Sequence, residues 1–210
     1  MISLDQYGIT LKRITEEDIE LIRNKRNTPA IRARMSYRKK ISSAEQKLWF
    51  QSINNQLNYY FLIKIDFKPI GVINCKEVNI VDQYGEGGIF IWDENYVGTP
   101  YPTFASLILL DFIFNELCIG NLSFARILSS NSGAQRYNKM LGYVKMPRQE
   151  NIDNQWYVLT KETFNKKSIL LKKAAKAFSK SEGKLIVRGG ICKENLNELN
   201  AYLEQNASSN

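Results

Sequence analysis

The sequence predicts an α+β protein in which helices pack on β-strands, followed by a small basic appendage. Three observations lead to this class. Strand-type runs and helical patterns alternate between residues 9 and 160. Residues 85–143 read in order as strand, glycine loop, apolar helix, strand and helix. From Thr160 onward the composition becomes rich in lysine, which marks the appendage.

The rest of the chain is organised around residues 85–143. Residues 86–92 are rich in β-branched and aromatic side chains, as is typical of a strand. A turn around Gly98 follows, and Pro102 suits the first turn of a helix, where an N–H group would have no intrahelical partner. Residues 103–117 carry a broad apolar face, which predicts a helix packed in the core.

A second strand and helix complete this stretch. The strand is expected over residues 122–129, and the helix over 132–141 ends at Gly142, a residue type that favours the position after a helix. A strand that enters a helix through a glycine loop leaves backbone N–H groups free at the positive end of the helix dipole. Such a loop either binds an anion such as phosphate or is an ordinary connection, and the stretch alone leaves both interpretations open.

The N-terminal part supplies the other elements of the body. Thr15 and Asp18 have the spacing of a capping box and predict the start of a helix. Ser43 predicts the start of a further helix. The remaining expected elements are strands over residues 9–14, 59–65, 69–78 and 155–159 and a short helix over residues 31–35.

The composition narrows the chemistry. The chain has 210 residues, 44% of them hydrophobic, which suffices for one domain with a core plus an appendage. It has no histidine, so acid–base work must fall to carboxylate, Tyr, Cys, Lys or water. Its three dispersed cysteines argue against a zinc site and for a reducing compartment. No signal peptide and no apolar run long enough for a bilayer are visible, so we expect a cytoplasmic protein without a membrane span.

The basic segment covers residues 161–193. Ten Lys and Arg residues against two acidic ones give it a net charge of +8, which equals the net charge of the whole chain. We expect a body, a basic accessory helix–strand–helix unit and a disordered tail, over residues 1–160, 161–205 and 206–210. The unit should contain elements over residues 169–179, 184–188 and 194–204, held by Ile169, Leu170, Leu196, Leu199 and Leu203. Its lysine-rich face is either solvated or a contact for an anion, and its few aromatic side chains argue against nucleic acid.

Three motifs resemble the GNAT acyl-CoA N-acyltransferases, over residues 7–160. Residues 86–91 with Gly98 resemble the family's fourth strand and pyrophosphate loop. Residues 131–143 resemble its helix-to-strand signature, in which an Asn precedes a small residue by three positions and a Gly–aromatic pair by eleven. The third motif resembles the PseH-like enzymes, which acetylate amino sugars on nucleotide carriers. It consists of Arg26-Asn27, Ile31-Arg32, Met35, Ile41, Glu45 and Trp49-Phe50.

The chain departs from the family pattern in the loop and in the last helix. Asn95 stands where the family has Arg or Gln, and Pro100 stands where it has Gly or Ala. Proline has no N–H group, so one phosphate donor is lost. The family's frequent tyrosine acid lies four residues before the closing glycine, a position held here by Asn138, with Tyr137 beside it.

The resemblance implies one mixed twisted sheet flanked by helices, with a cleft between residues 89–92 and 122–129. It implies acetyl-CoA as co-substrate and no metal. Glu86 is the candidate base, acting directly or through water, and Tyr137 is the candidate proton donor to the leaving thiolate. A purely structural role stays open for both side chains. The implied coenzyme-binding residues are Ile89, Phe90, Ile91, Trp92, Gly98, Thr99, Tyr101, Asn131 and Tyr137.

The PseH-like motif implies an N-acetyltransferase acting on a nucleotide-linked amino sugar, in the synthesis of surface glycans such as bacterial surface polysaccharide. Arg26 and Arg32 are candidates to clamp the diphosphate of this small-molecule substrate, with Trp49 as a further substrate contact, unless the arginines only form a solvated helix face. Two alternatives stay open: an acceptor that is a protein N-terminus or a polyamine, and a GNAT-fold binding module without catalysis. A basic chain favours the anionic acceptor over a cationic polyamine. A homodimer is left open.

Overall fold

The computed structural model describes residues 2–181 and 183–189, and within them the strands form a single mixed sheet. The strands follow the order β7-β8-β6-β5-β4-β3-β2-β1-β9. Their bounds are β1 (Ser3–Gln6), β2 (Ile9–Arg13), β3 (Tyr59–Ile65), β4 (Lys68–Asn79), β5 (Tyr84–Ile91), β6 (Leu122–Leu128), β7 (Val144–Lys145), β8 (Asn154–Thr160) and β9 (Ile186–Arg188).

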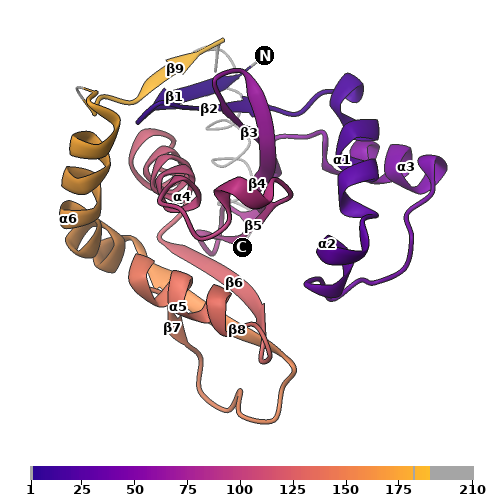
Figure 1. The fold of residues 1–210 in the computed structure, drawn as a ribbon. Helices are drawn as coiled ribbons and strands as arrows, with labels where there is room; N and C mark the ends of the chain where they lie inside the picture. The colour runs from indigo at the N-terminus through magenta and orange to yellow at the C-terminus, as the bar shows by residue number, and fades with distance from the viewer. Residues whose placement is uncertain (1, 182, 190–210) are drawn as a thin grey trace.

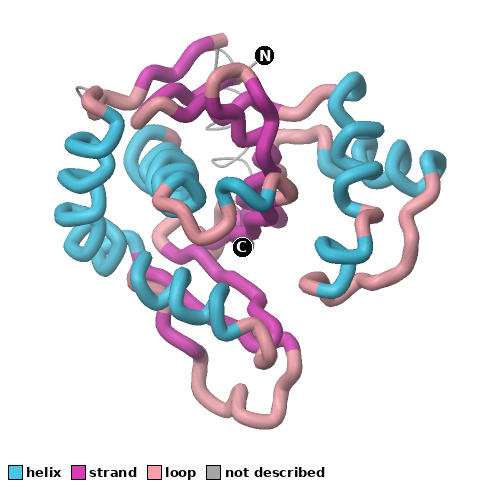
Figure 2. The backbone as a smooth tube through the Cα atoms, in the orientation of Figure 1, coloured by secondary structure: helices cyan, strands magenta, loops and turns pink. Residues whose placement is uncertain are grey.

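The helices lie on both faces of this sheet (Figure 1). Their bounds are α1 (Ile19–Arg26), α2 (Pro29–Ala33), α3 (Ser43–Ile53), α4 (Tyr101–Asp111), α5 (Ser132–Leu141) and α6 (Lys161–Ser179). One face packs against α1 and α3 through a small apolar cluster that includes Ile22, Phe50 and Val72. The other face packs against α4, and α6 covers the far side of α4 (Figure 2). The predicted arrangement of one mixed sheet flanked by helices is therefore confirmed.

The sheet opens at the junction of β5 and β6. These two strands are parallel, and their backbone pairing joins residues 84–87 to residues 122–125. The pairing then stops, although β5 continues to Ile91 along β4 and β6 continues to Leu128 along β8. We call this opening the fork. It lies where the sequence predicts a cleft.

Local capping signals place the helix ends well. The capping box of Thr15 and Asp18 is present at the short 3₁₀ turn that precedes α1. The cap of α3 is Ser42, one residue before the predicted position. Gly142 ends α5 with a φ of +107°, and a Cβ there would lie 3.2 Å from side-chain atoms of Leu159 and Thr163. Glycine is therefore favoured at this position both by backbone conformation and by space.

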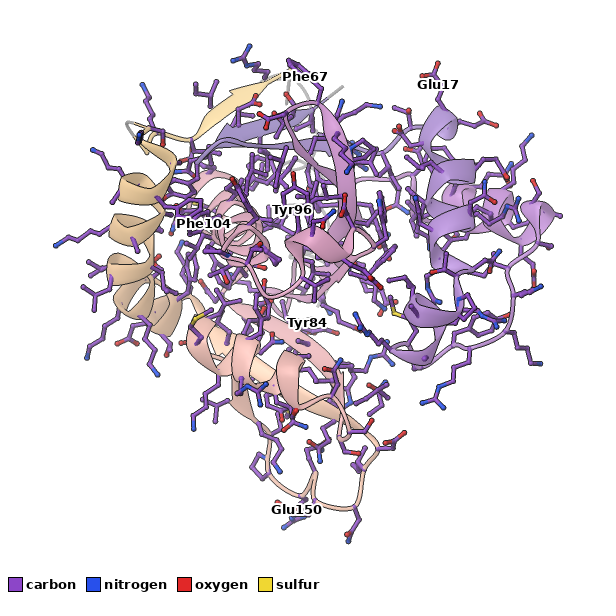
Figure 3. All side chains as sticks on the ribbon, viewed as in Figure 1. Glu17, Phe67, Tyr84, Tyr96, Phe104 and Glu150 are labelled. Carbon is purple, nitrogen blue, oxygen red and sulfur yellow. The ribbon has the colours of Figure 1, made fainter. Side chains whose placement is uncertain are left out.

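Two features of the predicted central helix differ in the structure. Every residue from Thr103 to Leu110 is buried, because α4 lies between the sheet and α6. The last turn is wound as a π-helix, Phe112–Glu116, where a single α-helix to residue 117 was expected. Figure 3 shows Phe104 among the interior side chains, whereas Phe67 at the β3–β4 turn is 91% exposed.

The basic segment begins as a helix eight residues earlier than predicted. The Thr160 side chain accepts a hydrogen bond from the Thr163 backbone N–H, so α6 starts directly after β8. The buried positions of α6 are Phe164, Ser168 and Ala175. Ile169 and Leu170 are exposed, so the prediction that they hold the segment is wrong.

The strand of this segment joins the main sheet. Residues 186–188 of β9 pair antiparallel with residues 3–5 of β1, against an expected strand over residues 184–188. The expected helix over residues 194–204, with Leu196, Leu199 and Leu203, and the tail from residue 206 lie outside the described residues. The division of the chain at residue 160 stays a prediction.

Candidate active site

A cavity of about 550 Å³ passes through the fork. Its walls come from both separated strands, with Gly88, Ile89 and Phe90 on β5 and Ala125 and Ile127 on β6. Side chains of α4 and α5 line it on one face of the sheet, and the α1–α2 region lines it on the other. The cavity therefore offers two approaches to the same point between the strands.

Two glycines leave β5 without side chains at this point of the cavity wall. A Cβ on Gly87 would lie 3.4 Å from the Ser123 and Tyr143 hydroxyl oxygens, and a Cβ on Gly88 would lie 2.9 Å from Asn74 Oδ1. Beyond Gly87, the backbone edge of β5 that faces β6 is no longer paired with it. An unpaired strand edge can receive an extended, amide-bearing ligand.

Glu86 lies in the cavity wall at the base of the fork. Its side chain is 12% exposed and meets two cations. Arg126 Nε donates to Oε1 and Arg126 Nη2 donates to Oε2, each at 3.0 Å. Lys76 Nζ lies 3.2 Å from Oε2 in an ion pair. The carboxylate is thus accessible from the cavity but already engaged.

Tyr137 lines the cavity between α4 and α5. Its hydroxyl donates to the Pro102 carbonyl oxygen at 2.9 Å and is hydrogen-bonded to the Ser106 hydroxyl. Burial raises the pKa of Tyr137, so the phenol keeps its proton at neutral pH. Tyr143 is bonded in a similar way to Ser123, at 2.6 Å, and burial raises its pKa as well.

Two asparagines of α5 also line the cavity. Asn131 caps the helix, since its side-chain oxygen accepts from the Ala134 N–H at 3.0 Å. Asn138 stands where the family pattern has tyrosine, and its side chain donates to the Ala134 carbonyl oxygen at 2.9 Å.

The glycine loop lies before α4, outside the walls of the cavity. Gly98 has a φ of +80°, and a Cβ there would meet no atom of the described residues within 4 Å. The Thr99 N–H donates to the Tyr96 carbonyl oxygen at 3.3 Å, so this donor is used within the turn. Tyr101 begins α4 and packs edge-on against Tyr96, with ring centroids 5.5 Å apart. Pro100 caps the helix and has no N–H to offer.

The last two residues of the expected strand also lie outside the cavity walls. Ile91 packs against the large core cluster. Trp92 lies on the opposite face, where its indole N–H donates to the Pro69 carbonyl oxygen at 3.1 Å.

The α1–α2 end of the cavity is basic and aromatic. Arg26 and Trp49 both line it, and Trp49 packs edge-on against Tyr60 at 5.3 Å between ring centroids. Arg26 Nη2 donates to the Tyr37 carbonyl oxygen at 2.8 Å. Its Nη1 atom is buried and has no hydrogen-bond partner among the described residues, and the same holds for the Nε atom of Arg32, which is not one of the residues that line the cavity. Burial lowers the pKa of Arg26, and the charge of Arg32 lowers it further.

The structure adds three charged residues that the sequence did not single out. Arg34, Lys76 and Arg126 all line the cavity. Arg34 follows Arg32 by two residues and could have been considered with it. Lys76 and Arg126 reach Glu86 only through strand register, which no local sequence signal gives.

Among residues 2–181 and 183–189, no three His, Cys, Asp or Glu side chains gather in a way that could hold a metal ion. In the same part of the chain, no helix combines the length and the hydropathy needed to cross a membrane.

Comparison with known proteins places this geometry in a family. The family model described as "Acetyltransferase (GNAT) domain" matches residues 9–144. No curated protein has a significant sequence match to the chain.

Several solved structures share the fold. The spermidine N-acetyltransferase from Vibrio cholerae in complex with CoA and spermine has 17% identity and a TM-score of 0.66, covering 75% of this chain and 98% of that one. A domain from Methanocaldococcus jannaschii DSM 2661 has 20% identity and a TM-score of 0.64, covering 74% and 99%. The aminoglycoside acetyltransferase AAC(6')-Ib in complex with coenzyme A has 15% identity and a TM-score of 0.65, covering 75% and 98%. This chain belongs to the GNAT acetyltransferase family, and it is an acyltransferase that takes acetyl-CoA as its co-substrate.

Proposed function

We propose that the enzyme transfers an acetyl group from acetyl-CoA to the amine of a nucleotide-linked amino sugar, in the cytoplasm and for surface glycan synthesis. The charge of the cavity carries this proposal. Four basic side chains line it, Arg26, Arg34, Lys76 and Arg126, against one acidic side chain, Glu86. Residues 21–44 include α2 and the loop after it, which lines this end of the cavity. They hold eight Lys and Arg residues and no acidic residue. Such a field attracts an anionic acceptor.

The arginine pair supports a phosphate-bearing acceptor in particular. Two neighbouring guanidinium groups repel each other, and each has a buried nitrogen without a partner in the described part of the chain. A diphosphate would supply acceptors to Arg26 and Arg32 and balance their charge. Trp49 and Tyr60 offer ring faces and edges for a base or a sugar. We assign Arg26, Arg32 and Trp49 to acceptor binding.

The same charge argues against a polycationic acceptor. The Vibrio cholerae neighbour is described with spermine, and another neighbour is described with kanamycin, both of which carry several amines. Such a ligand would meet a net positive wall here. A protein N-terminus carries a single positive charge and is the stronger of the remaining alternatives.

The coenzyme would approach from the α4–α5 face. The open backbone edge at Ile89, Phe90, Ile91 and Trp92 fits an extended amide chain, because pairing with β6 has already stopped there. We assign the phosphates to the loop of Gly98, Thr99 and Tyr101, with Asn131 and Tyr137 on the facing helix. Acetyl-CoA supplies the reactive thioester, and the residues of this chain hold and orient the reacting groups.

Glu86 and Tyr137 are the groups that we assign to proton movement. The amine must lose a proton as it attacks, and Glu86 can accept it directly or through a water. Because its pKa is raised, the Tyr137 hydroxyl keeps its proton. It can stabilise the leaving thiolate by donating a hydrogen bond to the sulfur in place of the Pro102 carbonyl oxygen. The thiolate then takes its proton from a water, or from this hydroxyl, which regains a proton from water.

A panel of amines tests the acceptor. We expect kcat/KM, measured by release of the CoA thiol, to be at least about tenfold higher for a UDP-linked amino sugar than for the same sugar without its nucleotide. The preference should shrink as salt rises, because charge steers the encounter. Arg26→Gln and Arg32→Gln should raise KM for the nucleotide-linked sugar but not for the sugar without its nucleotide. Arg38 is an exposed neighbour, and Arg38→Gln should leave both KM values unchanged. A higher kcat/KM for spermidine than for every nucleotide sugar would overturn the proposal.

Glu86→Gln tests the base. The rate should fall by about 10² or more, and the loss should be largest at low pH, where more of the acceptor amine is protonated. Glu150→Gln is the control, since Glu150 points into solvent from the β7–β8 loop (Figure 3). Equal activity of Glu86→Gln and wild type across the pH range would remove Glu86 from the mechanism.

A further inference from the structure

Four side chains form a row across the sheet at the base of the fork. Lys76 of β4 is the direct cross-strand neighbour of Glu86 on β5. Arg126 of β6 spans the fork to Glu86, and Trp156 of β8 is the cross-strand neighbour of Arg126. The row lies on the face of β4 that also presents Val72 to α1 and α3, the acceptor side of the cavity.

Arg126 is held firmly in this row. Its guanidinium makes two parallel hydrogen bonds to Glu86, at 3.0 Å each, and lies over the Trp156 ring with 5.0 Å between Cζ and the ring centroid. A bidentate pair fixes the plane of both groups, and the ring fixes the guanidinium from below. The orientation of the Glu86 carboxylate is therefore set from the β6 side.

Lys76 is held differently, because it has two partners. Its ammonium group donates a hydrogen bond to Glu77 Oε1 at 2.9 Å and lies 3.2 Å from Glu86 Oε2. Glu77 is exposed and sits at an irregularity of β4, with a φ of +51°. The Asn58 side chain accepts from the Glu77 N–H at 3.0 Å and stabilises this conformation. Bulges of this kind redirect side chains next to functional sites.

We propose that the Lys76 ammonium group occupies the place of the acceptor ammonium group on Glu86 Oε2, and that it gives up Glu86 and keeps only its Glu77 partner when the acceptor binds. This rests on the proposed role of Glu86. Two ammonium groups on one carboxylate oxygen repel each other, so the acceptor can reach Oε2 only if Lys76 leaves. Glu77 gives Lys76 a ready partner outside the cavity wall. Arg126 stays in place and acts as a positioning residue for Glu86.

The proposal predicts opposite effects on KM for a substitution of Lys76 and a substitution of Glu77. Lys76→Met removes the competing cation and should lower KM for the acceptor by about fivefold. Glu77→Gln removes the negative charge of the second partner, which favours Lys76 on Glu86, and should raise KM by a similar factor. Arg126→Met should act on kcat instead, lowering it by on the order of tenfold, with partial recovery in Arg126→Lys, because orientation is lost and not the binding place.

Steady-state kinetics of the full-length enzyme provide the test, with whichever amine the wild type acetylates fastest. If that amine is spermidine, the proposed acceptor class fails while the expected signs for Lys76 and Glu77 still apply. A raised KM in Lys76→Met would overturn the proposal, because Lys76 would then bind the acceptor. An unchanged KM in Glu77→Gln would overturn it as well. A melting temperature for each variant separates these effects from a loss of folding.

Discussion

Phe164→Ala should lower the free energy of unfolding by about 3–5 kcal/mol, the usual cost of truncating a buried phenylalanine. Phe164 is fully buried at the start of α6, and its ring lies 5.6 Å from that of Phe114 in the π-wound turn after α4. Removing the ring leaves a cavity where α6 meets the core. Chemical denaturation followed by circular dichroism measures the change.

Leu170→Ala is the matched control on the same helix. Leu170 is 75% exposed, so its truncation should change the free energy of unfolding by no more than about 0.5 kcal/mol. Equal losses in both variants would contradict the packing of α6 described above.

Gly88→Val should lower kcat/KM by at least about 10², because small misplacements of reacting groups have effects of this size. The new side chain would project from β5 beside Asn74, on the face that carries Glu86 and Lys76. It would narrow the acceptor side of the fork and leave the α4–α5 side unchanged. We therefore expect acetyl transfer to fail while calorimetry still detects acetyl-CoA binding.

Gly133→Val provides the comparison. Gly133 lies in the first turn of α5, where, among the residues that the structure describes, a Cβ would meet only Asn131 Oδ1 within 4 Å, at 3.7 Å. Transfer by this variant should match the wild type within about twofold. If Gly88→Val loses acetyl-CoA binding but keeps its fold, the assignment of the two faces of the fork is wrong.

The sequence predicted those parts of the fold that depend on local signals. The Thr15–Asp18 box and Gly142 act within one turn of chain, so their residue types suffice to locate helix ends. β1 was not predicted, since Ser3–Gln6 contains one apolar residue and forms by pairing with β2 through the turn at Tyr7 and Gly8. The glycine directly before Ile9 was the available sequence signal, and in the structure Gly8 has the left-handed conformation that a hairpin turn uses.

The buried side of α6 shows why a hydrophobic run misleads. Ile169, Leu170 and Leu171 are consecutive and therefore point in directions about 100° apart, so one helix face cannot bury all three. The face that packs on the body is set by Phe164, Ser168 and Ala175, with Leu171 in line. Hydrophobicity alone favoured the exposed pair, and the spacing from Phe164 would have excluded it.

The residues of the candidate site also fall into those that local sequence predicts and those that depend on the fold. Glu86 and Tyr137 were found through motifs that are continuous in sequence, and both line the cavity. Lys76 and Arg126 were not found, because one is paired with Glu86 across an antiparallel register and the other reaches it across the fork. These partners exist only once the strands are aligned.

The position of β1 between β2 and β9 has a consequence for how the molecule reaches its native state. Asp5 pairs with Ile186, so during synthesis β1 meets its outer partner only after all the residues between them have been made. At typical translation speeds, β1 exposes an unpaired edge for on the order of ten seconds. Contacts so distant in sequence also slow folding of the complete chain. A nascent chain that has not yet formed β9 therefore presents an open strand edge, which is a site for strand-mediated aggregation.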